Sequence, residues 1–326
     1  MLFAHSLRYI RRRTPWAHRD VATAALGRFE SDTQVDFSKF SSKIGTLRRR
    51  LKRPLTYAEK VLYNHLDDEF DGNIVRGQTQ LRSKPVRIAC QDATAQMALI
   101  QDCPKDIGCA TSRRVVALGI AERHINELAG IISVKGSTGS IIEYFGLGAQ
   151  TISATGMATV CNMGAESGAT TSIFPYTASM AEYLRANRRP DMAAAVETIA
   201  YELRSDEGAE YDQIIDIDLS SLEPHIDGPF TPDLSTPISK FGSAVIDNEW
   251  PSTLTAGLIG SCTNSSFHDL SRALLLSPGS LQTRNTLEEA GIMQVFEKAG
   301  AIMLPNACGP CCGSWDRTDI QKVSLT

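Results

Sequence analysis

Two segments toward the carboxyl end of the chain share one layout, a short apolar stretch that ends in a cysteine-containing turn. AGLIGSCTNSSFHDLSRALLL (256–276) predicts a strand, a turn and then a helix, and GAIMLPNACGPCCG (300–313) predicts a second strand before its cysteines. Strands and helices that alternate through right-handed crossovers form a mostly parallel α/β sheet, which carries its sites at the carboxyl ends of the strands. We therefore expect an α/β fold with Cys262, Cys308 and Cys311 at such a position.

The letters CGPC are typical of thiol-disulfide redox proteins, but that chemistry needs further strands and a helix after the pair, and only 15 residues follow Cys311. A metal centre needs thiolates from separate segments, and Cys262 offers a third. Cys312 or His268 could complete a zinc site, or the three thiolates could hold an iron-sulfur cluster with one iron free. Adjacent cysteines rarely ligate one tetrahedral ion, which argues against Cys312. An open iron is a Lewis acid that can coordinate a substrate hydroxyl and carboxylate.

The composition is that of a globular protein with two or three domains, since the chain has 326 residues, 42% of them hydrophobic. The net charge is -4, and Lys and Arg are scattered among acids, so no field would attract nucleic acid. No apolar run reaches the roughly 18–20 residues that span a bilayer, so no membrane partner is expected. With no secretory signal, the thiols should be reduced, and Cys90, Cys103, Cys109 and Cys161 are interpreted as structural residues.

Residues 1–20 contain five arginines and no acid before Asp20, with apolar residues between the basic ones. That composition predicts a mitochondrial transit peptide, which forms a basic amphipathic helix, and hence a location in the mitochondrial matrix. The alternative is a disordered basic tail.

The middle of the chain alternates predicted strands and helices. Residues 42–68 predict two helices with a break at Pro54, and the arginine and lysine run at 48–53 is interpreted as a solvated helix face, with RNA contact as the alternative. Val86–Ala89 predicts a buried strand that turns into a helix near Asp92, with Gln91 on the turn. Further predictions are helices at 179–189 and 191–204, a half-exposed strand within 211–222, and an extended, proline-rich connection rather than a helix at 228–241.

The segment 131–146 repeats the pattern of short strand, glycine loop and apolar stretch, and its KGSTGS loop predicts a tight turn rather than a phosphate site. Residues 151–174 are rich in Gly, Ala, Ser and Thr, which predicts a tightly buried helix. Asn162 and Glu166 do not fit that reading. Four apart, they would share one helix face, and a carboxylate among small apolar residues has to be paired or used.

At this point the motifs become recognisable. GLIGSCTNSS and NACGPCCGSWD resemble the two cluster-binding signatures of the aconitase family. Five further segments of this chain resemble segments that occur in the same order in aconitases. They are ACQDATAQM, VKGSTGSIIEYFG, SATGMATVCNMGAESGATTSIFP, YDQIIDIDLSSLEPHIDGPFTPDLSTP and PGSLQTR. The resemblance runs from about Arg53 to Ile320 and is greatest to the mitochondrial type.

The resemblance implies that Cys262, Cys308 and Cys311 ligate a [4Fe-4S] cluster whose fourth iron binds substrate. It also implies that Gln91 hydrogen-bonds a substrate carboxylate and that Asn162 and Glu166 lie beside the open iron, with Glu166 at the bound hydroxyl or water. The implied reaction is the reversible dehydration and rehydration of a di- or tricarboxylic hydroxy acid such as citrate.

The implied fold is a remnant of the three packed aconitase α/β domains around the cluster, without the C-terminal swivel domain. After the predicted leader, we expect remnants of the first, second and cluster-binding third domains at 21–124, 125–240 and 241–326. Between ALIQ (98–101) and ELAGI (127–131) a long family segment has no counterpart, and it carries a catalytic histidine and the GTDSHTP motif. A shorter family segment is missing before PGSLQTR, and the serine base and substrate-clamping arginines of the swivel domain have no counterpart either.

Three interpretations remain open on this basis. The chain is a citrate-type hydro-lyase, active alone or with a separate chain that supplies a swivel-like domain. It is a specialised copy acting on a 2-alkylmalate or a homocitrate-like acid in amino-acid or secondary-metabolite synthesis. Or it is a non-catalytic remnant, or the product of a gene model that misplaced residues 102–124, because proton removal from carbon needs an oriented base.

Overall fold

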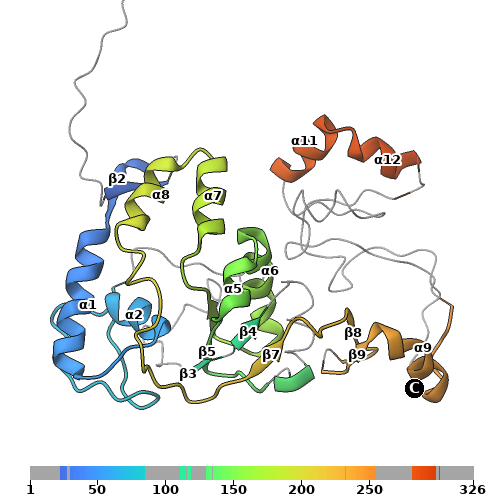
Figure 1. The fold of residues 1–326 in the computed structure, drawn as a ribbon, viewed down its shortest axis with the longest axis horizontal. Helices are drawn as coiled ribbons and strands as arrows, with labels where there is room; N and C mark the ends of the chain where they lie inside the picture. Colours follow the sequence, from blue (N-terminus) through green and yellow to red (C-terminus); the bar gives the residue numbers. More distant parts are fainter. Residues whose placement is uncertain are drawn as a thin grey trace, which may run out of the picture.

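The computed structural model describes residues 23–27, 30–84, 111–114, 116–118, 130–133, 135–231, 233–253, 281–298 and 301. Within these ranges the chain is a mixed α/β protein (Figure 1). The strands are β1 (Thr23–Gly27), β2 (Glu30–Asp36), β3 (Thr111–Arg114), β4 (Val116–Leu118), β5 (Ser140–Glu143), β6 (Thr171–Ile173), β7 (Asp216–Asp218), β8 (His225–Asp227) and β9 (Ser235–Pro237). The helices are α1 (Phe37–Leu51), α2 (Tyr57–Asn64), α5 (Leu147–Thr151), α6 (Ala154–Asn162), the 3-10 helix η1 (Met163–Ser167), α7 (Ala178–Ala186), α8 (Pro190–Glu197), α9 (Ile238–Asp247), α11 (Leu281–Glu289) and α12 (Ile292–Lys298).

The parallel pairing expected of an α/β protein is present in two small sheets. β5 lies between β3 and β6 and is parallel to both, and β4 is parallel to β7. The other two described sheets are the antiparallel hairpins β1–β2 and β8–β9. Helices connect β5 to β6, as a parallel pair requires, because its strands cannot be joined by a tight turn.

The two predicted helices on either side of Pro54 are confirmed as α1 and α2. Asp36 caps α1, accepting a hydrogen bond from the Ser38 N–H at 3.0 Å, and the helix ends at Lys52 with a left-handed φ of 52°. α2 begins with a capping box in which Thr56 and Glu59 each accept from the other's backbone N–H at 3.1 Å. These caps explain why the break falls at Pro54.

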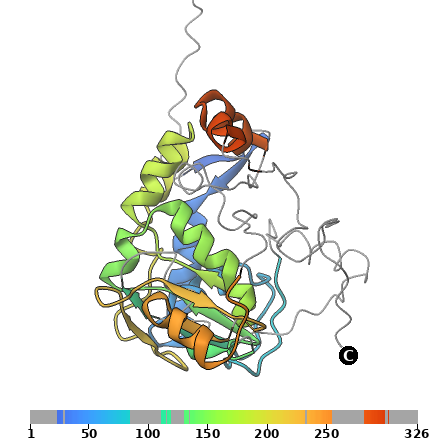
Figure 2. The ribbon, with the colours of Figure 1, turned by 90° about the vertical axis from the view of Figure 1, so that its right-hand side faces the viewer.

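Two hydrophobic clusters define two regions of the molecule, visible as the blue and the green parts of Figure 1. The helical region comprises residues 36–84 with the segment 202–212, and its core contains Ile44, Leu47, Leu55, Tyr63, Leu66 and Ile74. The sheet region comprises residues 135–187 with β7, and its core contains Ile142, Tyr144, Ala149, Ile152, Met157, Val160, Phe174, Ile217 and Leu219. The turned view in Figure 2 shows α7 and α8 continuing upward from the sheet region toward the β1–β2 hairpin, on which α8 packs.

Several further predictions are confirmed and others need correction. α7 confirms the helix predicted at 179–189. α8 confirms the start of the helix predicted at 191–204, but it ends at Glu197 and residues 198–204 form turns and bends. β7 is half exposed as predicted, with Ile217 buried between exposed neighbours. The strand expected before the glycine loop is wrong, because residues 130–132 are helical; a short apolar run does not distinguish a strand from a helical turn. The connection 228–241 is wrong at its end, because α9 begins at Ile238, directly after the last proline.

The basic run at 48–53 is solvated only in part, since Arg49, Arg50 and Lys52 are exposed whereas Arg48 and Arg53 are half buried. Arg48 binds Glu202 and Asp206, Arg50 donates to the Phe70 and Gly72 carbonyls, and Arg53 binds Glu59. The partners lie far along the chain or beyond the helix, so the sequence pattern gave no sign of them.

The strand predicted at Val86–Ala89 lies outside the described residues. No helix in the described part of the chain is both long enough and apolar enough to span a bilayer. The domain boundaries stay a prediction.

Candidate functional site

Asn162 and Glu166 lie on consecutive but different helices. α6 ends at Asn162, which is half buried, and Glu166 belongs to the 3-10 helix η1 that follows. The expectation that both residues share one α-helical face is therefore wrong, since a 3-10 helix has three residues per turn. What remains of the prediction is proximity along the chain, at the point where the polypeptide turns from α6 toward β6.

The glycine loop fixes the position of η1. The Ser137 N–H donates to the Ser167 carbonyl at 3.1 Å, and Thr138 forms a β-bridge with Ala169. Ser167 is fully buried and donates from Oγ to the Gly164 carbonyl at 2.8 Å. Gly139 has a left-handed φ of 72°, which confirms the tight turn. The backbone carrying Glu166 is thus anchored to the amino ends of β5 and β6.

Polar groups close to this backbone have unusual surroundings. Tyr144 Oη and the Oγ atoms of Ser140 and Ser172 are buried, and none makes a hydrogen bond of normal geometry to the described residues. The Ser172 hydroxyl nevertheless lies close enough to Tyr144 to oppose the rise that burial causes in the pKa of Tyr144. Burial raises the pKa of the Cys161 thiol to about 12, so this thiol stays protonated at neutral pH. The interpretation of Cys161 as structural rather than ligating agrees with that environment.

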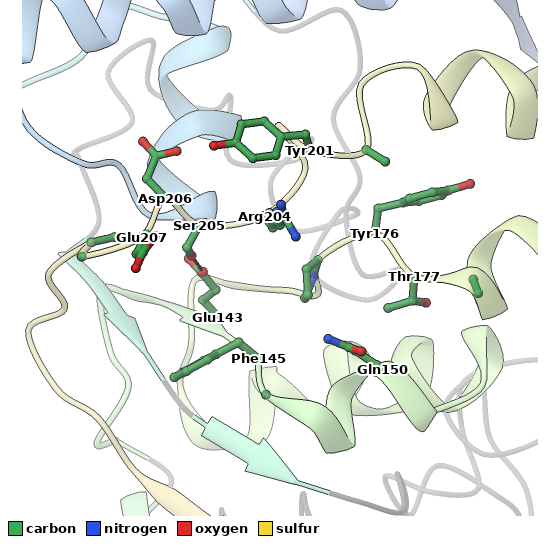
Figure 3. A pocket seen from close by; sticks show the side chains of 16 residues that line it. Glu143, Phe145, Gln150, Tyr176, Thr177, Tyr201, Arg204, Ser205, Asp206 and Glu207 are labelled. Carbon is green, nitrogen blue, oxygen red and sulfur yellow. Dashed lines mark hydrogen bonds between the residues drawn. The ribbon is translucent and has the colours of Figure 1, made fainter.

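A cavity of about 940 Å³ opens at the other edge of the same sheet. It lies outside the carboxyl ends of β5 and β6, where Glu143, Phe145, Pro175 and Tyr176 line it, and the 201–209 segment closes the opposite side (Figure 3). The residues that line this cavity were not predicted from the sequence. The one available signal was Glu143 itself, an acid that ends the otherwise apolar strand SIIE.

Glu143 is buried and joins the two regions. Its Oε2 accepts from the Ala58 N–H at the start of α2 at 3.0 Å, and its Oε1 accepts from Tyr211 Oη at 3.0 Å and from Ser205 Oγ. A buried carboxylate with three donors is satisfied. Glu143 therefore holds the 202–212 segment and α2 against the sheet and is not free to act on a ligand.

The other predicted site residues, Gln91, Cys262, Cys308 and Cys311, lie outside the described residues, as does the side chain of Glu166. Within the described ranges, no three His, Cys, Asp or Glu side chains come together in a way that could hold a metal ion. The described part of the site is therefore the platform formed by the glycine loop, the end of α6 and η1.

Comparisons with known proteins point to one family. The family model described as the aconitase family (aconitate hydratase) matches residues 101–326. The chain is 36% identical to the mitochondrial aconitate hydratase of Schizosaccharomyces pombe, over 94% of this chain and 56% of that protein. It is 37% identical to that of Aspergillus fumigatus, over 90% of this chain and 54% of that protein, and 35% identical to that of Saccharomyces cerevisiae, over 90% and 55%.

The chain spans about half the length of the curated relatives it matches. The match to the Schizosaccharomyces pombe protein extends over 438 residues, which is longer than the 326-residue chain itself, so it includes positions that have no counterpart here.

Proposed function

Because the chain belongs to the aconitase family, we propose that it is a hydro-lyase that reversibly dehydrates and rehydrates a hydroxy polycarboxylic acid of the citrate–isocitrate type. The observation that carries the proposal is the 36% identity to a mitochondrial aconitate hydratase over 94% of this chain. The names of the relatives and the basic leader together support action in the mitochondrial matrix.

Aconitases carry a [4Fe-4S] cluster. We expect Cys262, Cys308 and Cys311 to hold it, because thiolates are the ligands that such clusters need and because these three cysteines come from two separate segments. The protonated thiol of Cys161 is unsuited to that role. When bound, a cluster with three protein ligands supplies an open iron, a Lewis acid for a hydroxyl and a carboxylate.

The remaining roles fall to the residues of this chain. Gln91 would donate to a substrate carboxylate, and Asn162 and Glu166 would orient the hydroxyl that leaves as water. A general acid must be held at a fixed place to protonate a leaving hydroxyl efficiently. The anchoring of η1 by Ser137 and Ser167 supports this assignment, since it limits the motion of the backbone next to Glu166.

Proton removal from carbon is the step for which the chain offers no evident base. The family motif GTDSHTP has no counterpart here. General acid–base groups contribute about 10²–10⁴-fold each to the rate. We therefore expect turnover several orders of magnitude slower than in an enzyme with the base, unless a separate chain supplies it. Two alternatives are addressed by the same experiment. The substrate is a related acid such as a 2-alkylmalate, or the chain binds its cluster without turnover.

The test is anaerobic reconstitution of the full chain with iron and sulfide, followed by hydration assays on cis-aconitate and a set of alkylmaleates. Cys308→Ala should abolish the visible absorbance of the cluster, whereas the matched control Cys161→Ala should retain it. Hydration of cis-aconitate by the wild-type chain supports the citrate-type reaction, and hydration of an alkylmaleate alone identifies the specialised acid. A reconstituted cluster with no turnover on any alkene would contradict the proposal for the chain acting alone.

A further inference from the structure

The cavity at the carboxyl ends of β5 and β6 is separate from the proposed catalytic residues. Asn162 and η1 lie at the amino ends of these strands, because α6 runs back antiparallel to them before β6 begins. The cavity lies at the opposite edge of the sheet, where open α/β sheets usually bind their ligands. Its volume of about 940 Å³ falls within the range of small-molecule sites.

Most acids that line the cavity are already engaged. Glu143 accepts three hydrogen bonds from the protein, as described above. Asp206 binds Lys60 at 2.8 Å and Arg48 at 2.6 Å. Ser205 donates to Glu143 and accepts from the Tyr57 N–H. Glu143 and Asp206 are therefore held by groups of the protein, and of the acids that line the cavity only the exposed Glu207 stands outside these networks.

Two long polar side chains enter the cavity from opposite sides. Figure 3 shows Arg204 on the loop that follows α8 and Gln150 on α5, with the rings of Phe145 and Tyr201 to either side. The Arg204 guanidinium lies 4.8 Å from the centroid of the Tyr201 ring and is exposed. No carboxylate of the described residues forms a salt bridge with it, whereas Arg48, Arg53 and Arg76 of the helical region all have acidic partners.

We propose that this cavity is a second binding site, which takes a small organic anion through its carboxylate or phosphate group at Arg204. The guanidinium fork matches two oxygens of either group, and the Gln150 amide can donate to a third. Phe145 and Tyr201 provide aromatic walls for the carbon part of the molecule. The cavity is much larger than an inorganic ion needs, which favours an organic anion over a bare one.

The test is hydrogen–deuterium exchange of the full chain with citrate and, separately, with inorganic phosphate at millimolar concentration. Binding in the cavity should protect residues 145–150 and 200–209, whereas binding at the catalytic platform would protect residues 162–167. The two sites are thus distinguished even if the chain holds no cluster and has no turnover. Protection by citrate alone indicates that the site takes a carboxylate, and protection by phosphate alone indicates that it takes a phosphate group.

Arg204→Gln should raise the ligand concentration that gives half-maximal protection about 10- to 100-fold. This is the loss of affinity expected when a charge-assisted hydrogen-bond pair is removed. The fold should survive, because the Arg204 side chain is exposed and its carbonyl, which accepts from Lys60 at 2.7 Å, is kept. Arg204→Lys should bind at an intermediate strength, since it keeps the charge without the fork. The control Arg284→Gln on α11 should bind like the wild type. Absence of protection by both anions, or equal protection in Arg204→Gln and the wild type, would overturn the proposal.

Discussion

The helical region and the sheet region differ in their buried polar groups: the buried charges of the helical region are paired, whereas some buried hydroxyls of the sheet region make no hydrogen bond of normal geometry. In the helical region, the buried charges of Lys60 and Glu59 each have several partners. In the sheet region, the buried hydroxyls of Ser140, Tyr144 and Ser172 make no hydrogen bond of normal geometry to the described residues, although Ser172 lies close to Tyr144. Unpaired buried polar groups are rare and costly in folded proteins, so their concentration in one region calls for a physical reason.

In the helical region the reason for full pairing is charge. The side chain of Lys60 is 1% exposed, and it binds Asp206 at 2.8 Å and the Arg204 carbonyl at 2.7 Å. Burial acts to raise the pKa of Asp206, but hydrogen bonds from Arg48 and Lys60 outweigh it and hold that pKa well below its usual range. A buried ion without such partners would cost several kcal/mol, so each partner in this network stabilises the region.

In the sheet region the unpaired groups are neutral hydroxyls, whose burial costs less. Ser140 and Ser172 lie on β5 and β6, whose amino ends hold η1 with the proposed catalytic Glu166, and Tyr144 directly follows β5. Functional sites commonly retain local costs of this kind that the rest of the fold offsets. The comparison suggests that the helical region and its links to Glu143 supply rigidity, while the sheet region gives up some stability near the site.

Removing one charge from the helical network should have the largest effect. Asp206→Asn leaves Lys60 buried with only Glu202 at 3.6 Å as an acidic partner. We expect a loss of about 3 kcal/mol in the free energy of unfolding, the lower end for a broken buried pair, because Arg48 is 29% exposed. Urea denaturation measures it.

The matched control is Asp68→Asn, which breaks the exposed pair with Lys43 and should leave the urea midpoint nearly unchanged. The pKa of Asp206 is lowered in the folded state, so its contribution is present above about pH 4 and lost as the pH falls further. Wild type and Asp206→Asn should therefore converge in acid. A constant difference at all pH values would show that the effect is not electrostatic.

Two buried tyrosines give a direct test of the comparison. Tyr63 is 2% exposed and donates to Glu59 Oε1 at 3.2 Å, whereas Tyr144 is fully buried and its hydroxyl makes no hydrogen bond of normal geometry to the described residues. Tyr63→Phe should cost about 1–2 kcal/mol, because it leaves a buried carboxylate with one donor fewer. Tyr144→Phe keeps the stacking on Phe174, at 4.5 Å between ring centroids, and should be neutral or stabilising.

Thermal unfolding of both variants, side by side, is the measurement. Equal destabilisation by the two substitutions would contradict the distinction between the regions. A large loss in Tyr144→Phe alone would mean that its hydroxyl has a partner that the comparison overlooks.

Local signals made part of this fold predictable from the sequence. Pro54 indicated the boundary between the two predicted helices, and the alternation around Ile217 identified β7, because each signal depends on residues a few positions apart. The glycine loop was predictable as a turn for the same reason. The motifs also indicated the family that the comparisons support.

Contacts between distant residues were not predictable. Arg48 was interpreted as part of a solvated face because nothing near it in sequence announces Glu202 and Asp206, more than 150 positions later. Glu143 depends on donors at positions 58, 205 and 211, which only the fold brings together. The switch from α6 to the 3-10 helix after Asn162 was missed because the sequence spacing fits a continued α-helix, whereas contacts with the glycine loop favour the tighter turn.

Asp227 on β8 lies outside both regions, and its substitution should have the smallest effect on stability. One of its oxygens is buried without a partner among the described residues, and burial raises its pKa to about 6 against the opposing influence of Ser235 and His225. Because the pKa of Asp227 is higher in the folded state, the protein is stabilised when this carboxyl is protonated. That contribution to the free energy of unfolding is complete below about pH 4 and is lost as the pH rises through 6. Asp227→Asn keeps the shape without the charge, so it should remove this decline and be the more stable protein above pH 6, by a modest amount because Asp227 is only partly buried.

The measurement for Asp227→Asn is the melting temperature from pH 4 to pH 8, with Asp218→Asn as the control. Asp218 on β7 is exposed, and hydrogen bonds from Ser220 lower its pKa, so its replacement should bring no gain at neutral pH. If Asp227→Asn is instead less stable than the wild type at neutral pH, the carboxylate has a donor and belongs with Asp206 among the paired groups. If Asp227→Asn is the more stable protein at neutral pH, the lack of a partner, rather than burial alone, makes the Asp227 carboxylate costly. Asp206 is mostly buried as well, yet it stays ionised because Lys60 and Arg48 pair with it.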